Sequence, residues 1–321
     1  MNEPLTIVPP GFLSFLNFPV ATDLNALQAD VAILAAPNGT PYAATGPYVD
    51  SADAPAAIRA ESIKSSEALD HYDFDLGGPL LDGRAVRVVD CGDVRSDPLD
   101  VAGTCGRITE ATAAILRAGA LPILLGGDDS VPIPFFRAFQ DHPAVSEPIT
   151  LVQIDSHIDW RDEVKGVREG YSSTMRRASE MPWIGPMFQI GMRGVGSARP
   201  QEVADARAYG STLIPARELH REGVERILRR VPDGGPYIVT IDCDGIDPSV
   251  MPAVNAPVPG GLSFHQVADI LQGLARKGRV IGFDIVELAP RFDVNGLSAN
   301  AAGRLVLNLI GALARSGQLG G

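Results

Sequence analysis

One stretch constrains the fold of this chain more than any other. An apolar run typical of a buried β-strand, Ile149 to Ile154, ends abruptly in Asp155-Ser156-His157-Ile158-Asp159. Side chains two positions apart on an extended backbone point in the same direction. We therefore expect Asp155, His157 and Asp159 to converge on one point, provided that the backbone stays extended beyond the end of the strand.

A second stretch repeats this pattern. Residues 237–241 are apolar and run into Asp242-Cys243-Asp244, and Asp247-Pro248 follows at the turn. In open α/β sheets, ligands bind in the crevice beyond the carboxyl ends of the strands. A single Asp at such an end is often only a turn former or a helix cap. Two matched acidic clusters, one of which contains a histidine, instead predict a site for a pair of divalent cations.

Composition narrows the classes of function. The chain has 321 residues, of which 45% are hydrophobic, and its net charge is −12. It lacks a basic run, so we expect no nucleic-acid partner. We expect no membrane partner either, because the N-terminal stretch has neither a basic segment nor an apolar run of sufficient length. Three cysteines without a C-x-x-C pair favour a reduced, cytoplasmic location.

Strand-like and helix-like segments alternate along the chain, without a repeat or a low-complexity linker. This pattern predicts a single-domain, three-layer α/β/α fold with a mostly parallel sheet of about eight strands. Residues 1–28 are interpreted as an N-terminal arm, and residues 29–321 as the α/β domain. Apolar side chains in the arm (Phe12, Phe15, Leu16 and Phe18) favour packing on the body over packing on another subunit.

The expected elements follow from periodicity and from start and stop signals. The expected strands are 29–37, 86–90, 121–125, 149–154, 187–191, 212–214, 237–241 and 280–286. The expected helices are 54–66, 105–118, 224–230, 263–277 and 298–315, with Ser263 as an N-cap. Long loops are expected at 40–54 and 160–183. After the strand 121–125, the pair Gly126-Gly127 indicates a close contact of the backbone, and Asp128-Asp129-Ser130 follows.

With these motifs in order, the chain resembles the ureohydrolases, the family of arginase, agmatinase and guanidinobutyrase. The resemblance is nearest to the bacterial agmatinase and guanidinobutyrase-like branch, and it covers the chain from about Ala29 onwards. Four segments carry it: Asp155 to Asp159, Thr240 to Pro248, Pro252 to Leu262, and Asp284 to Pro290. The third segment matches the family in length and frame, and the others match it in the positions of the acids.

The resemblance implies two divalent cations per chain, Mn²⁺ in the first place and Ni²⁺ as an alternative. A hydroxide that bridges the cations would attack a guanidinium carbon and release urea and an amine. On the family pattern, Asp155 and Asp242 would bridge the two metals. His157 and Asp244 would complete the shell of one metal, and Asp159 would belong to the other.

Two further acids are implied in catalysis. Glu287 would pair with the guanidinium group of the substrate, because a carboxylate offers bidentate geometry to a planar fork of donors. Asp247 would hold the attacking hydroxide or orient the site. A turn-capping role for Asp247, from the Asp-Pro sequence, remains open as an alternative.

The chain departs from the family pattern at three places. Asp129 stands where the family has a histidine ligand of the first metal; we expect it to bind that metal, and to favour harder ions. The loop from Tyr171 to Arg177 lacks the proton-relaying histidine of the family, so Tyr171, a serine or water would take its place. Asn255-Ala256 replaces Gly-Thr near the metals and would reshape the pocket floor.

These residues predict hydrolysis of a small guanidino compound, agmatine-like or guanidino-acid-like. Asn255 and Tyr171 are candidate substrate-binding residues. Weaker candidates for the far end of the substrate are Asn38, Tyr42, Tyr48 and Arg176. Two alternatives stay open: a non-catalytic or weakly active subunit of a hetero-oligomeric ureohydrolase, and a nickel-dependent hydrolase of substituted guanidines or biguanides. The family resemblance also implies a homo-oligomer, a trimer or a hexamer.

Overall fold

The computed structural model describes residues 7–8, 13–40, 42, 50–142 and 147–320. Within them, nine strands form one sheet in the order β1-β3-β2-β4-β9-β8-β5-β6-β7. The strands are β1 (Ile7–Val8), β2 (Val31–Ala36), β3 (Val88–Val94), β4 (Leu121–Gly126), β5 (Ile149–Ile154), β6 (Ile184–Ile190), β7 (Thr212–Ile214), β8 (Gly234–Asp242) and β9 (Gly278–Val286). All pairings are parallel except that of β1 with β3.

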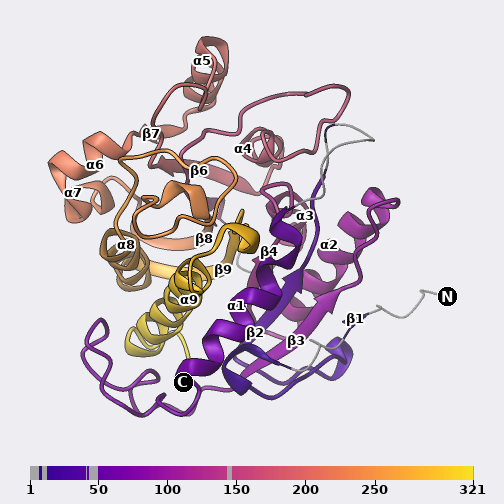
Figure 1. Cartoon of the computed structure of the whole chain (residues 1–321), viewed down its shortest axis with the longest axis vertical. Coiled ribbons are helices and arrows are strands. Elements are labelled where there is room, and N and C mark those ends of the chain that lie inside the picture. Colours follow the sequence, from indigo (N-terminus) through magenta and orange to yellow (C-terminus); the bar gives the residue numbers. More distant parts are fainter. Residues whose placement is uncertain (1–6, 9–12, 41, 43–49, 143–146, 321) are drawn as a thin grey trace.

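Helices cover both faces of this sheet (Figure 1). They are α1 (Ala54–Ser62), α2 (Val101–Arg117), α3 (Pro132–Arg137), α4 (Thr174–Ala178), α5 (Pro200–Tyr209), α6 (Ala216–Glu222), α7 (Val224–Leu228), α8 (Phe264–Lys277) and α9 (Leu297–Arg315). One hydrophobic cluster lies between the sheet and α1, α6, α7, α8 and α9, and a second lies between the sheet and α2, α3, α4 and α5. The predicted three-layer α/β/α fold is confirmed.

Strand β2 shows why helices must pack on both faces of the sheet. Val31, Ile33 and Ala35 pack into the first cluster, and the alternate residues Ala32 and Leu34 pack into the second. Because successive side chains of a strand point to opposite faces, an uninterrupted apolar strand is stable only when helices bury both faces. The continuous apolar runs in the sequence are therefore the signature of this architecture.

The arm packs on the body where the structure describes it. The backbone N–H of Phe15 donates to Asp90 Oδ2 at 2.8 Å, and that of Leu16 donates to Ser62 Oγ at 2.8 Å. Strand β1 pairs with the end of β3, which explains why β3 runs to Val94 and not to the expected Asp90. Phe12, the other apolar residue expected in this contact, lies outside the described residues.

Some helices differ from the prediction, either because an N-cap residue was not recognised or because the helix is short or mostly exposed. Helix α2 begins at Val101 because the side chain of Asp100 accepts from the Gly103 N–H at 2.9 Å. The predicted Ser263 cap of α8 is confirmed. The expected loop 160–183 contains α4, which is too short to show helical periodicity, and α5 was missed because only Ala206 on it is buried.

Helix α9 is long and apolar enough to cross a membrane by length and composition alone. Its most apolar 18-residue window is nevertheless 83% buried inside the protein. In Figure 1 the helix lies across the centre of the molecule, against α1 and α8. Its composition therefore fits a core helix that packs between the sheet and its neighbours.

Two glycines allow strand ends to approach each other at the carboxyl edge of the sheet. A Cβ atom on Gly127, after β4, would lie 1.8 Å from the carbonyl oxygen of Asn38, after β2. A Cβ atom on Gly245, after β8, would lie 2.6 Å from the backbone nitrogen of Asp155, after β5. The close contact predicted for the Gly126-Gly127 pair is thus present, and both contacts draw acid-bearing segments together.

Candidate active site

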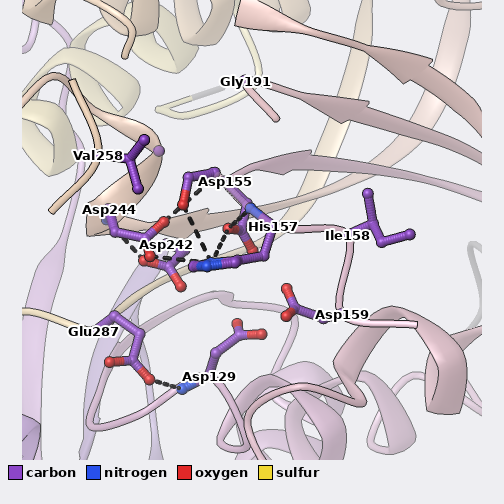
Figure 2. Close-up of polar contacts among 12 residues, drawn as sticks. Asp129, Asp155, His157, Ile158, Asp159, Gly191, Asp242, Asp244, Val258 and Glu287 are labelled. Atoms are coloured by element: carbon purple, nitrogen blue, oxygen red, sulfur yellow. Dashed lines mark hydrogen bonds and ion pairs between the residues drawn. The ribbon is translucent and has the colours of Figure 1, made fainter. Parts of the chain in front are cut away.

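Four neighbouring strands, β4, β9, β8 and β5, bring the predicted acids to one place. Each acid lies at or just after the carboxyl end of its strand, where side chains of parallel strands meet. The residues are Asp129 after β4, Glu287 after β9, Asp242 and Asp244 at the end of β8, and Asp155, His157 and Asp159 after β5. Figure 2 shows their side chains around a common centre.

Two groups of possible ligands share one residue. Asp155, His157 and Asp244 offer ligand atoms that all lie within 4.8 Å of one another, and so do Asp129, Asp155 and Asp242. His157 Nδ1 lies 3.1 Å from Asp244 Oδ2 and 3.4 Å from Asp155 Oδ1. Because Asp155 belongs to both groups, this arrangement suits a pair of cations with Asp155 between them.

Asp159 lies outside both groups. Its φ of 43° places it in the left-handed region, so the expectation that the backbone stays extended beyond β5 is wrong. The turn directs the carboxylate toward Gln153, whose Nε2 donates to Asp159 Oδ2 at 2.9 Å and to Asp155 Oδ2 at 2.6 Å. Asp159 still lines the same cavity as His157, so it faces the site from the side.

The electrostatic properties of these acidic side chains favour the binding of cations. Burial, followed by repulsion from neighbouring carboxylates, raises the pKa of Asp129, Asp155 and Asp242 well above the ordinary range. Among the described residues, His157 is the one basic side chain in ion-pair contact with the acidic centre, where it pairs with Asp155 and Asp244. Burial lowers the pKa of His157, but the hydrogen bond and charge of Asp244 outweigh it and raise that pKa to about 10.

Asp129 carries the clearest sign that a cation belongs here. Its Oδ2 is buried and has no hydrogen-bond partner in the described part of the chain. An unpaired buried carboxylate oxygen is costly unless it is protonated or coordinates a metal. The carboxylate-rich donor set, with one imidazole, suits ions such as Mn²⁺ that prefer oxygen ligands.

A buried relay of side-chain amides holds two of the acids. Ser211 Oγ donates to Gln189 Oε1 at 2.8 Å, and Gln189 Nε2 donates to Gln153 Oε1 at 2.7 Å. Gln189 Nε2 also donates to the carbonyl oxygen of Ile158 at 2.9 Å. Since a carbonyl oxygen accepts only, this contact fixes the orientation of the Gln189 amide, and hence that of Gln153. The Gln153 donors must then face Asp155 and its neighbour Asp159.

This amide relay was not predicted from the sequence. Gln153 and Gln189 are 1% and 0% exposed, respectively, in the centres of β5 and β6. A long polar side chain inside an otherwise apolar strand is itself a signal, because a buried amide requires several partners. The two glutamines are paired in register across the strands, which the sequence alone does not show.

Glu287 lines the same cavity as His157. Its Oε1 accepts from the backbone N–H of Asp129 at 2.9 Å, and its Oε2 accepts from Ser51 Oγ at 3.4 Å. Its φ of 65° is rare for a non-glycine residue and costs roughly 1–3 kcal/mol, which is typical of functional positions. Burial, and then repulsion from Asp128, raises the pKa of Glu287 to about 8, so a cation beside it would be stabilised.

A cavity of about 580 Å³ opens from the acidic centre to solvent. Both predicted substrate-binding residues, Asn255 and Tyr171, line it, and so does Tyr42. The rings of Tyr42 and Tyr171 lie 4.4 Å apart, and Tyr42 Oη accepts from the Ser172 N–H at 2.7 Å. This pair joins the two long loops into one wall of the cavity.

The other candidates lie elsewhere. Asp247 is not part of the cavity lining; its carboxylate accepts from Ser249 Oγ at 2.6 Å and from the N–H groups of Gly260 and Gly261 at 2.8 and 3.0 Å. The structure therefore gives Asp247 the turn-capping role left open above. Asn38 and Arg176 are also absent from the lining. Tyr48 lies outside the described residues.

The fold and the shared ligand Asp155 define a class: a single-domain α/β protein with a ligand set for two cations at the carboxyl edge of its sheet. The chain belongs to the arginase family, whose family model matches residues 29–311. This is a family of binuclear metal enzymes. The resemblance inferred from the motifs is confirmed.

Known proteins agree in sequence and in fold. The chain is 35% identical to guanidinopropionase of Pseudomonas aeruginosa, over 72% of this chain and 73% of the relative. It is 30% identical to agmatinase of Pyrococcus horikoshii, over 90% and 93%. The structure of proclavaminate amidinohydrolase from Streptomyces clavuligerus matches with a TM-score of 0.80 at 26% identity, covering 98% of this chain and 100% of that one. The protein is an amidinohydrolase, a hydrolase of guanidino carbon–nitrogen bonds.

Proposed function

We propose that this protein hydrolyses the guanidinium group of one small guanidino compound to urea and an amine, with two divalent cations, manganese in the first place. Water adds to the guanidinium carbon, the bond from that carbon to the substituted nitrogen breaks, and the nitrogen leaves as an ammonium group. The observation that carries the proposal is the shared carboxylate of Asp155, which joins two ligand groups beside the half-buried carboxylate of Glu287.

The ligand groups divide the acids between two positions. Asp129, Asp155 and Asp242 would hold one cation, and Asp155, His157 and Asp244 the other. Two such cations, when bound, would lower the pKa of a coordinated water molecule and so make a nucleophile available near neutral pH. The unpaired Oδ2 of Asp129 supports a ligand role for this residue in place of the family histidine.

Glu287 orients the substrate. The N–H of Asp129 and the hydroxyl of Ser51 hold its carboxylate from one side, which leaves lone pairs for a planar cation in the cavity. A guanidinium group forms bidentate hydrogen bonds with a carboxylate in this geometry. Such a pairing would place the guanidinium plane beside the ligand groups and lower the pKa of Glu287 toward its ordinary value.

The leaving nitrogen needs a proton. Within the described residues, His157 is the one histidine in the cavity lining, and it already belongs to a ligand group. Tyr171 and Ser172 line the cavity and face solvent in part. Their positions support a proton path through a hydroxyl group or through water in this protein.

The test combines metal analysis with urea release from a panel of guanidino compounds, with manganese or nickel added. We expect about two metal ions per chain, and urea from at least one compound. Glu287→Gln should keep its metal content while kcat/KM falls roughly 30-fold or more, because a buried charge partner contributes about 2–5 kcal/mol. Intact kcat/KM in this variant would refute the role of Glu287.

Two alternatives make distinct predictions. The replaced histidines at Asp129 and in the loop after Tyr171 favour, as a second candidate, a non-catalytic subunit that assembles with an active ureohydrolase. That candidate predicts fewer than two metals per chain and no urea from any compound. A hydrolase of substituted guanidines or biguanides predicts activity on those compounds with nickel only.

We propose further that the chain forms a homotrimer or homohexamer in the cytoplasm. Three unpaired cysteines and exposed apolar side chains such as Phe74 and Val294 support this. Light scattering coupled to size-exclusion chromatography tests the assembly, and a monomer at micromolar concentration would contradict it.

A further inference from the structure

Five charged side chains line the cavity outside the acidic centre: Asp50, Arg161, Lys165, Glu202 and Arg291. Four of them form ion pairs. Arg291 contacts Asp50 at 2.6 Å, and Arg161 contacts Glu202 at 3.6 Å, while Glu202 also contacts Arg199 at 3.0 Å. Lys165 has no ion-pair partner among the described residues. Among the described residues, the outer part of the cavity therefore has a positive charge at Lys165 that no acidic side chain pairs with.

This lysine differs from the other two lysines in the sequence. Lys64 pairs with Glu61, and Lys277 pairs with Asp233. These pairs lie on the surface, away from the cavity lining. An unpaired exposed lysine is ordinary by itself, so its place in the lining needs a structural reason.

A tight turn provides that reason. Val164 and Val167 exchange two backbone hydrogen bonds of 2.9 Å, so that Lys165-Gly166 forms a two-residue hairpin turn. Lys165 has φ 50° and Gly166 has φ 85°, the signs expected of a type I′ turn. Asn, Asp or Gly is favoured at the first of these positions, and a lysine there is strained. The hairpin therefore holds the backbone of Lys165 beside the cavity, and its side chain forms part of the lining.

The inner, less exposed part of the cavity lining and its outer, exposed part thus carry opposite charge. The inner end has Glu287 and the ligand groups, which suit a guanidinium cation. The outer end has the ammonium group of Lys165, which suits a carboxylate and repels an amine. A molecule with a guanidinium at one end and a carboxylate at the other matches both ends.

We propose that Lys165 binds the carboxylate of an ω-guanidino acid, and that the protein selects such acids over guanidino compounds with a cationic tail. This inference rests on the proposed function, since it assumes that the guanidinium enters the acidic end. It makes Lys165 a specificity-determining residue, in contact with the part of the substrate that does not react.

The test compares ω-guanidino acids of two to four methylene groups with agmatine, whose tail is an amine. Initial rates of urea release give kcat and KM, and calorimetry with each compound gives its binding constant independently of turnover. We expect at least one acid to exceed agmatine in kcat/KM. Lys165→Asn keeps the turn, because asparagine favours this position, and removes the charge. Its KM for the acid should rise about fivefold to tenfold with little change in kcat.

Two further variants complete the design. Lys165→Arg should restore most of the affinity for the acid, and Lys165→Glu should raise the KM for the acid further while it lowers the KM for agmatine. Lys64→Met, at a surface ion pair, is the matched control and should leave all constants unchanged.

The outcomes separate the two proposals. Urea release from acids and agmatine that is equal in the wild type and insensitive to Lys165→Asn would overturn the specificity inference and leave the proposed function intact. The absence of urea from every compound would overturn the proposed function. In that case, calorimetric binding of an acid that depends on Lys165 would still support the carboxylate subsite. If no acid bound, both the proposed function and the carboxylate subsite would be overturned.

Discussion

Replacing Gln189 with leucine should weaken both the fold and the acidic centre. The substitution conserves volume but removes the donors to Gln153 Oε1 and to the carbonyl oxygen of Ile158. Both acceptors are buried where water has no access, and each unsatisfied acceptor costs about 1–3 kcal/mol. We therefore expect a loss of about 2–6 kcal/mol in the free energy of unfolding.

The same substitution should also weaken metal binding, because Gln153 orients the candidate ligands Asp155 and Asp159. Without Gln189 to fix its orientation, the Gln153 amide is free to turn its oxygen toward Asp155 and Asp159, where it repels their carboxylates. Loss of a partner that orients metal ligands commonly weakens metal binding by about 10- to 100-fold. Chelator competition with manganese or nickel measures this affinity, and thermal unfolding of the same samples measures stability.

A matched control separates this effect from the general cost of the substitution. Gln201 on α5 is exposed and contacts Asp205 only, so Gln201→Leu should change stability by less than about 0.5 kcal/mol. The reasoning is refuted if Gln189→Leu unfolds within about 1 °C of the wild type and binds metal equally tightly. A loss of stability with unchanged metal affinity would limit the relay to a structural role.

Further predictions concern the metals, the backbone and pH. Asp129→His should raise the affinity for nickel relative to manganese, measured by competition between the two ions, because imidazole suits nickel better than a carboxylate does. Removal of the cations by a chelator should lower the unfolding temperature, since each site loaded at 100 times its Kd contributes about 2.7 kcal/mol; an unchanged temperature would contradict resident metals. Gly127→Ala should destabilise the protein by more than about 2 kcal/mol or prevent soluble expression, as its Cβ would overlap the carbonyl oxygen of Asn38. Burial alone would raise the pKa of Asp73, but the hydrogen bond and charge of Arg304 lower it below the ordinary value. The stability from this pair is present above about pH 4 and is lost as the pH falls through the folded pKa, so the difference between the wild type and Arg304→Leu, in thermal melts from pH 7 to 3, should shrink at the acidic end.

The positions of acids that follow directly after a buried strand were predicted best from the sequence. Asp155 and Asp242 could be placed together because an apolar run followed by an acid marks the carboxyl end of a buried strand, and all such ends meet at one edge. Asp159 also reaches the cavity, but through a left-handed turn that strand periodicity does not encode.

Contacts between segments that are distant in the chain could not be predicted from the sequence. The Gln153–Gln189 pair depends on the register of β5 with β6, and register follows from packing across the whole sheet. Lys165 depends on a hairpin whose Lys-Gly sequence lacks the usual Asn-Gly or Asp-Gly signal. Asp247 shows the opposite case, because its Asp-Pro sequence already pointed to the turn that the structure contains.

The order of the strands determines when the site can exist during protein synthesis. Strands β4 and β5 are consecutive in the chain, yet β9 and β8, which are synthesised later, lie between them. Until those strands arrive, the ends of β4 and β5 have no shared neighbour, and a complete sheet would separate them by about three strand spacings, or roughly 14 Å. Each ligand group also contains one acid from the end of β8 or from the turn after it, Asp242 or Asp244. A nascent or truncated chain that ends before β8 therefore lacks both groups, and only a chain translated beyond this strand would be able to bind the two proposed cations.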